Sequence, residues 1–175
     1  MRRPITAFFI LAVASITAAP ARAQDATDQR PKAIEYSEGY ETRARIHRIA
    51  SYATLPLVGT EMWLGQQTFD GNDNYKGAHI AVGTAVTGLF ALNTVTGVWN
   101  LWDARKDPNH RALRIAHGLI MLGADAGFAA AYATAPGGRN LFGLNNDQRD
   151  QHRMIALTSL GVAAGGYLMM LVGNR

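Results

Sequence analysis

The feature that most restricts how this chain can fold is a series of four long apolar stretches separated by short polar segments. The stretches cover residues 46–65, 77–101, 112–135 and 154–173. A helix needs about 20 apolar residues to cross a hydrocarbon core of roughly 30 Å, and each stretch is at least that long. All four mix Gly, Ala and Thr with Leu, a composition typical of membrane helices that pack closely. The sequence therefore predicts four transmembrane helices.

The segments between the stretches are short, and they contain residues that start helices or form turns. Asp107-Pro108, before the third stretch, indicates a helix start, because Asp caps a helix and Pro fits its first turn. Short connections make consecutive helices antiparallel neighbours. We therefore expect an all-α fold, a membrane-embedded four-helix up-down bundle. The alternative is a soluble four-helix bundle with unusually apolar helices.

The tryptophans favour the membrane interpretation. Trp63 lies near the end of the first stretch, and Trp99 and Trp102 lie at the end of the second. Such amphipathic rings concentrate where a helix meets the headgroup region. The lipid bilayer is therefore the first partner that the sequence predicts.

The first 23 residues have the pattern of a cleavable secretory signal. Arg2 and Arg3 precede an apolar run over residues 5–16, and Ala21-Arg22-Ala23 matches a small-x-small cleavage site. An uncleaved anchor helix is the alternative, and in both cases the following segment is exported. We expect a signal peptide (1–23), a polar periplasmic arm (24–43) and a four-helix transmembrane domain (44–175) in a bacterial-type inner (cytoplasmic) membrane.

The basic residues conflict with this orientation. With the arm outside, ten Lys and Arg residues fall on the outer side and four on the inner side. This distribution is opposite to the positive-inside rule. We give priority to the signal because its three-part pattern is nearly complete. The alternatives are that the segment is not a signal or that a helix is miscounted.

Composition and missing motifs exclude several classes of protein. The chain has no Cys, which excludes disulfides, thiolate metal sites and covalent haem attachment. The net charge is only +4, and the basic residues flank apolar stretches, so we expect no nucleic-acid partner. The chain also lacks a nucleophile elbow, a phosphate loop, a dinucleotide fingerprint and an HExxH motif, which argues against hydrolases and nucleotide-using enzymes.

Each apolar stretch carries one histidine near its N-terminal end: His47, His79, His117 and His152, with His110 in the connection before the third stretch. Alternate helices of an up-down bundle begin on the same face and lie diagonally. His47 and His117 should therefore lie toward one face, and His79 and His152 toward the other. Two diagonal pairs at two depths are the arrangement that holds two stacked b-type haems. Each iron would have two axial imidazoles, which suits electron transfer because no coordination position stays open.

A single histidine has a simpler interpretation as an interfacial side chain. Arg48 and Arg153 stand beside His47 and His152, which indicates an interfacial depth for those two. The other two histidines reach further into apolar sequence, where an ionisable group points to function. The matched placement of all four favours haem iron ligation.

The segments IHRIASYATLPLVG, KGAHIAVGTAVTGLFALN, RIAHGLIMLG and HRMIALTSLGVAAGG resemble the core of the eukaryotic-type cytochrome b561 and ferric-reductase-like superfamily. The resemblance covers residues 45–172 and rests on histidine placement and small residues. It implies two haem b groups, with His47 paired with His117 and His79 with His152 as axial ligands. Members of that superfamily usually have six helices, and only the central four are present here. No ascorbate-site motif is found, so no substrate is carried over.

We therefore expect a di-haem b-type transmembrane electron carrier that moves electrons between haems on the two membrane faces. A quinol or a periplasmic redox protein would be its partner, and an oxidoreductase activity follows if haem is bound. Arg45, Arg48 and Arg114 are candidates to contact haem propionates, with lipid phosphate as the equal alternative.

Two other interpretations stay open. The first is a haemless polytopic interaction or assembly protein whose histidines are interfacial. The second is a zinc or iron site made of histidines with Glu61 or Asp125, which would need side chains from both ends to converge at one depth. Asp125 is either a packing residue hydrogen-bonded to a neighbour or a group that takes up a proton.

Overall fold

The computed structural model of this chain describes residues 34–136 and 148–173. The predicted signal peptide (1–23) and residues 24–33 of the predicted arm lie outside the described residues. Within the described ranges all regular structure is helical, as predicted. The elements are α1 (Glu38–Phe69), η1 (Asp73–Tyr75), α2 (Lys76–Asp103), η2 (Ala104–Lys106), α3 (Arg111–Ala133) and α4 (Gln148–Gly173), where η marks a short 3₁₀ helix.

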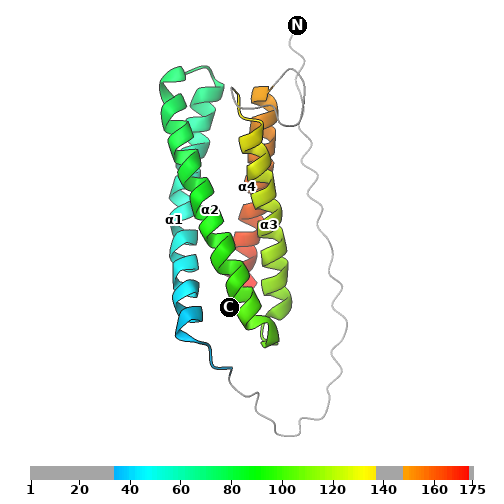
Figure 1. Cartoon of the computed structure of the whole chain (residues 1–175). Helices are drawn as coiled ribbons and strands as arrows, with labels where there is room; N and C mark the ends of the chain where they lie inside the picture. The colour runs from blue at the N-terminus through cyan, green and yellow to red at the C-terminus, as the bar shows by residue number, and fades with distance from the viewer. Residues whose placement is uncertain (1–33, 137–147, 174–175) are drawn as a thin grey trace, which may run out of the picture. The chain divides into compact units, whose positions relative to one another are not determined.

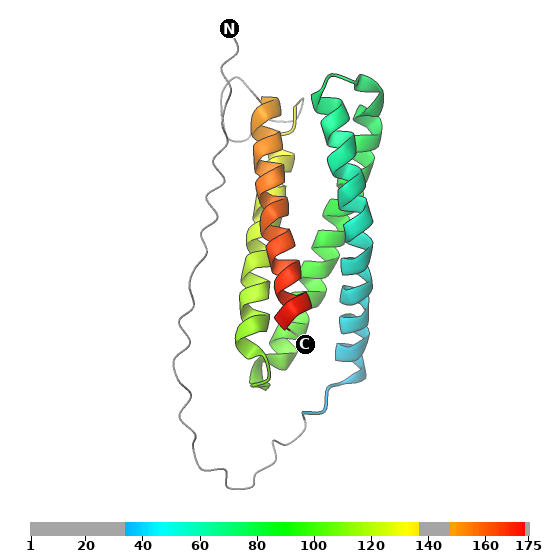
Figure 2. The ribbon, with the colours of Figure 1, turned by 180° about the vertical axis from the view of Figure 1, so that it is seen from behind.

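The four long helices lie side by side and alternate in direction along the chain (Figures 1 and 2). α1 packs along α2, and α3 packs along α4, so the helices form two antiparallel hairpins. α2 and α3 provide the main contact between the hairpins. Helices α1 and α3 are therefore diagonal to each other, and so are α2 and α4.

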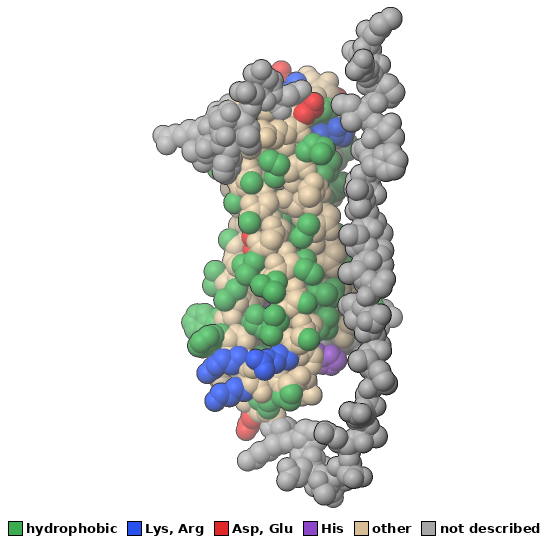
Figure 3. Space-filling view, turned by 90° about the vertical axis from the view of Figure 1, so that its right-hand side faces the viewer, with side chains coloured by type: hydrophobic (Ala, Val, Ile, Leu, Met, Phe, Trp, Pro, Cys, Tyr) green, Lys and Arg blue, Asp and Glu red, His purple; other side chains and the backbone are tan. Residues whose placement is uncertain are grey.

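Three of the helices are long and apolar enough to cross a membrane: α2 with its flanking turns (Asp73–Lys106), α3 and α4. Their apolar side chains lie largely on the surface, with Val95, Leu119 and Val172 more than 60% exposed. Figure 3 shows hydrophobic side chains spread over the middle of one face, with Lys and Arg gathered near one end. A water-soluble helix would turn such residues inward, so this exterior suits contact with lipid.

Helix α1 departs from the sequence prediction in two ways. It begins at Glu38, inside the segment expected to be a polar arm, because Ser37 caps it and accepts a hydrogen bond from Tyr40 N. Glu38 and Glu41 in the first turn also favour a helix start. Its extra turns and Glu61 make α1 the least apolar of the four, and it is not among the three apolar helices above.

The core between the hairpins is built from a few side chains near mid-height. Val86 and Phe90 of α2 pack against Ala124 of α3 and Ala163 of α4. The Phe90 ring also stacks at a tilt on Phe128, with ring centres 4.7 Å apart. The two alanines of this core leave room for the larger Val86 and Phe90 side chains.

α3 and α4 approach each other closely at Gly127. A Cβ atom added at Gly127 would lie 2.1 Å from Ser159 Oγ and 2.9 Å from its Cβ. Gly127→Ala should therefore force the two helices apart and lower the free energy of unfolding by about 1–3 kcal/mol, the usual cost of overpacking. Thermal unfolding in detergent measures this loss.

Gly123→Ala is the matched control, because nothing lies within 4 Å of a Cβ at Gly123 on the same helix. It should leave the midpoint unchanged or slightly higher, since Ala favours helix over Gly. Equal midpoints for the two variants would show that α3 and α4 are not packed this closely.

Candidate functional site: two histidine pairs

The four helix histidines meet in two pairs, one toward each end of the helices. The rings of His47 on α1 and His117 on α3 have centres 6.4 Å apart. The rings of His79 on α2 and His152 on α4 have centres 6.1 Å apart. Each pair joins diagonal helices and is a pair that the sequence predicted. His110 stands apart, in a left-handed conformation at the start of α3.

Contacts within the second hairpin show that the pairs lie at two levels. His117 Nδ1 is 3.1 Å from the carbonyl oxygen of Gly166, and His152 Nδ1 is 2.7 Å from that of Ala131. His117 precedes Ala131 by 14 residues, and His152 precedes Gly166 by the same number. At 1.5 Å per residue the two levels are about 21 Å apart along the helices. Both levels therefore fit within the thickness of one bilayer.

The Nδ1 atom of each histidine faces an oxygen. His47 Nδ1 lies 3.0 Å from the carbonyl oxygen of Asn93, and His117 and His152 likewise face carbonyl groups. A carbonyl oxygen only accepts, so Nδ1 carries the proton in these three rings and the Nε2 lone pair stays free. His79 Nδ1 lies 2.8 Å from Glu61 Oε1, in an ion-pair contact rather than an aligned hydrogen bond. A histidine oriented through Nδ1 is typical of metal ligation through Nε2.

The spacing of the rings fits one iron per pair. An imidazole nitrogen binds a metal at about 2.0 Å and lies about 1.1 Å from its ring centre, so two axial imidazoles have centres about 6.2 Å apart. The observed separations, 6.4 and 6.1 Å, lie close to this value. The ring planes in the pairs cross at 84° and 80°. Within each pair the two rings therefore meet edge to face rather than stacked.

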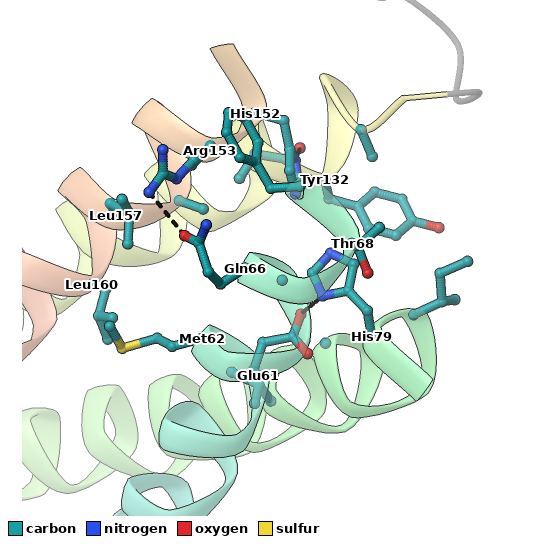
Figure 4. Close-up of a pocket in the computed structure, with 18 of the residues that line it drawn as sticks. Glu61, Met62, Gln66, Thr68, His79, Tyr132, His152, Arg153, Leu157 and Leu160 are labelled. Atoms are coloured by element: carbon teal, nitrogen blue, oxygen red, sulfur yellow. Dashed lines mark hydrogen bonds and ion pairs between the residues drawn. The ribbon is translucent and has the colours of Figure 1, made fainter. Parts of the chain in front are cut away.

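A cavity of about 780 Å³ surrounds the His79 and His152 pair, with walls from all four helices. Figure 4 shows Glu61, Gln66 and His79 on one side of it and His152 with Arg153 on the other. Apolar side chains make up most of the wall. Cofactor sites usually have this size and character, with a few polar groups that fix orientation.

Glycines make room for the imidazoles of the first hairpin. A Cβ atom at Gly65 of α1 would lie 3.3 Å from His79 Cε1 on α2. A Cβ atom at Gly97 of α2 would lie 3.1 Å from His47 Cε1 on α1. At each of the two levels, a histidine of one helix of this hairpin therefore packs against a glycine of the other.

Two arginines of α4 line the cavity, and the sequence did not single them out as ligands. Arg153 donates to Gln66 Oε1 at 2.9 Å, and Arg149 donates to the Thr68 carbonyl at 2.8 Å. Guanidinium groups at a cavity mouth suit carboxylates such as haem propionates. Arg149 lies three residues before His152 and Arg153 one residue after it. This proximity in sequence to a candidate ligand could have indicated that both arginines line the site.

The predicted propionate contacts at the other end have a mixed outcome. Arg45 and Arg48 are exposed on α1, on either side of His47, and are open to propionate or lipid phosphate alike. Arg114 instead donates to the carbonyl groups of Ala104 and Asp107, at 3.2 and 2.8 Å. It therefore holds the connection between α2 and α3 in shape.

Asp125 lies between the two levels and belongs to neither pair. It accepts a hydrogen bond from Thr94, which ties α3 to α2, as the packing interpretation predicts. Its other oxygen is buried and has no hydrogen-bond partner among the described residues. In the part of the chain that the structure describes, no three His, Asp or Glu side chains converge to hold a metal ion. This observation gives no support to a zinc or iron site made with Glu61 or Asp125.

Comparison of the chain with protein-family models, with curated proteins and with solved structures gives no match. The functional inference therefore depends on the geometry of the two histidine pairs and on the cavity around one of them. Both are made of this chain's own side chains.

Outside the helices, Tyr36 and Asp107 join the start of α1 to the connection before α3. Burial, together with the hydrogen bond that Tyr36 donates to Asp107, raises the pKa of Tyr36 to about 12. The same hydrogen bond, with one from Asn109 N and the nearby Arg114, lowers the pKa of Asp107 below its ordinary value of 3.8.

Tyr36→Phe should lower the thermal midpoint at neutral pH by a few degrees, because this link is lost. The depressed pKa of Asp107 makes its contribution complete above pH 3.8 and lost as the pH falls through the folded-state value. The raised pKa of Tyr36 makes its contribution complete below pH 10.0 and lost as the pH rises through about 12. The wild-type and variant midpoints should therefore converge at both extremes, and a gap independent of pH would contradict this.

Proposed function

We propose that this chain is a membrane-embedded four-helix up-down bundle that binds two haem b groups and carries electrons between the two faces of the membrane. The proposal follows the resemblance to the core of the cytochrome b561 and ferric-reductase-like superfamily. One observation carries it: four histidines from four helices meet in two diagonal pairs, each at the ring spacing of two imidazoles on one iron.

The roles of the residues follow from their contacts. His47 and His117 would hold one haem, and His79 and His152 the other. When bound, the two haems supply one-electron chemistry with no open coordination position. The oxygens at Nδ1 orient the imidazoles, and the apolar walls exclude water. Arg149 and Arg153 are placed to pair with propionates at one end, and Arg45 and Arg48 take that role at the other.

Helix α1 is proposed as the fourth crossing. Two polar groups along its length have partners within the bundle: Thr54 donates to the carbonyl of Ala50, and one oxygen of Glu61 lies against His79. Internal satisfaction of polar groups is what a bilayer demands of a spanning helix. Trp63 and Trp99, both about half exposed, lie near opposite ends of this hairpin, where lipid headgroups would meet them.

The proposed location is a bacterial-type inner membrane, with the arm exported by the signal-like N-terminus. The His47 and His117 pair then lies toward the periplasm, and the other pair toward the cytoplasm. A quinol or a cytoplasmic reductant would give electrons on one side, and a periplasmic redox protein would take them on the other.

A haemless interaction protein is the second candidate, and one observation favours it. The ring of His117 joins α3 to α4 through Gly166, and the ring of His47 joins α1 to α2 through Asn93. Histidines of this kind stabilise helix pairs without any cofactor. The two candidates differ in whether the histidines act pairwise across the diagonal.

Haem content of the purified full-length protein tests the proposal. Reduced-minus-oxidised spectra should show b-type bands with two haems per chain. His47→Ala, His117→Ala and the double variant should each lose one haem, because either ligand is needed for the same iron. His79→Ala and His152→Ala should likewise share the loss of the other haem.

His110→Ala is the control, since His110 lies in neither pair. It should keep both haems. A wild-type protein that stays colourless after haem supplementation would remove the proposal and leave the haemless candidate.

A further inference from the structure

The two histidine pairs differ in what stands behind their imidazoles. His47, His117 and His152 turn Nδ1 toward backbone carbonyl oxygens, at 3.0, 3.1 and 2.7 Å. His79 turns Nδ1 toward a carboxylate instead, with Glu61 Oε1 at 2.8 Å (Figure 4). A carbonyl group is neutral, whereas a carboxylate brings a negative charge. The His79 and His152 pair is therefore electrostatically different from the other pair.

The position of Glu61 is built into the first hairpin. A Cβ atom at Gly83 of α2 would lie 2.7 Å from Glu61 Oε1, so a glycine there lets the carboxylate reach its place. The side chains of Glu61 and His79 are only 21% and 22% exposed. The second oxygen, Oε2, is buried and has no hydrogen-bond partner among the described residues. A buried carboxylate oxygen without a hydrogen-bond partner costs free energy, which points to a functional reason for keeping it.

We propose that Glu61 is a positioning residue that lowers the reduction potential of the centre held by His79 and His152, so that this centre gives its electron to the centre held by His47 and His117. The inference rests on the proposed function and adds a direction to it. One electron moves, the first centre is oxidised and the second is reduced, and no bond forms or breaks.

The physical reason is twofold. A carboxylate at Nδ1 makes the imidazole a more basic ligand, which favours the higher oxidation state of the metal. Its negative charge also stabilises the oxidised, more positive centre through Coulomb attraction in a medium of low dielectric constant. Both effects lower the potential.

Cationic side chains stand near both centres, so their effects on the two reduction potentials are similar and largely cancel in the difference between them. Arg149 and Arg153 line the cavity at the His79 end, and Arg45 and Arg48 flank His47 at the other. The carboxylate at Nδ1 has no counterpart among the three other helix histidines. The Glu61 carboxylate is therefore the feature that determines which centre has the lower reduction potential.

Potentiometric titration of the haem-loaded full-length protein tests the role of Glu61. The wild type should titrate in two one-electron waves. Glu61→Gln keeps the shape and removes the charge, and it should raise the lower wave by about tenfold in the reduction equilibrium constant, which is about 59 mV for one electron. Glu61→Asp retains the charge and should stay closer to the wild type.

Asp125→Asn is the matched control. It removes a carboxylate that lies on α3 between the two levels, and Asp125 accepts a hydrogen bond from Thr94 rather than facing a histidine. It should shift the lower wave much less than Glu61→Gln does. An unshifted lower wave in Glu61→Gln overturns the proposal.

Single-centre variants decide the question without any change at Glu61. His117→Ala keeps both imidazoles only at the His79 and His152 centre, and His152→Ala keeps both only at the other. The His117→Ala protein should have the lower midpoint, and an equal or reversed order overturns the inference. If Glu61→Gln alone fails to load haem, this comparison still decides. A wild type that takes up no haem instead removes the proposed function itself.

Discussion

The hydrogen bond from an imidazole Nδ1 to an oxygen of the neighbouring helix is the interaction on which the geometry of the two histidine pairs, and with it the proposed haem binding, depends. His47 makes it across the first hairpin, and His117 and His152 make it across the second. Each bond fixes the tautomer and the direction of the ring, and it leaves Nε2 for a ligand role. Because these bonds stay within the hairpins, the two rings of a diagonal pair are free of each other and stand 6.1 to 6.4 Å apart.

The packing of the helices also helps to position the histidine rings. Glycines stand where an imidazole, a carboxylate or another helix comes close, at Gly65, Gly97, Gly83 and Gly127. The apolar residues left on the outside suit lipid, while the buried Thr54 and Thr96 donate to carbonyl groups of their own helices. This distribution is stable in a bilayer, because an unpaired polar group in hydrocarbon costs free energy. The cavity that all four helices line leaves room for a proposed cofactor between the hairpins.

Much of this arrangement could be predicted from the sequence, and the limits have physical causes. The histidine pairs were predictable for two reasons. A histidine near each helix start fixes the level at which the ring lies, and short connections fix which helices are diagonal. The early start of α1 was not, because Ser37 caps it outside the apolar pattern. The contact between Glu61 and His79 was missed because it depends on how α1 and α2 are rotated about their axes, which hydropathy does not specify. Arg114 was a candidate to contact a haem propionate or a lipid phosphate, and in the structure its guanidinium donates to the connection next to it.

The central claim is that two imidazoles, one from each hairpin, hold each of two iron centres. An electron paramagnetic resonance spectrum of the oxidised, haem-loaded protein tests it most directly, because it reports the ligand field of each ferric ion. Two low-spin signals in equal amount are expected, as six-coordinate haems with two axial imidazoles give. A dominant high-spin signal, or only one low-spin species at full loading, would contradict it.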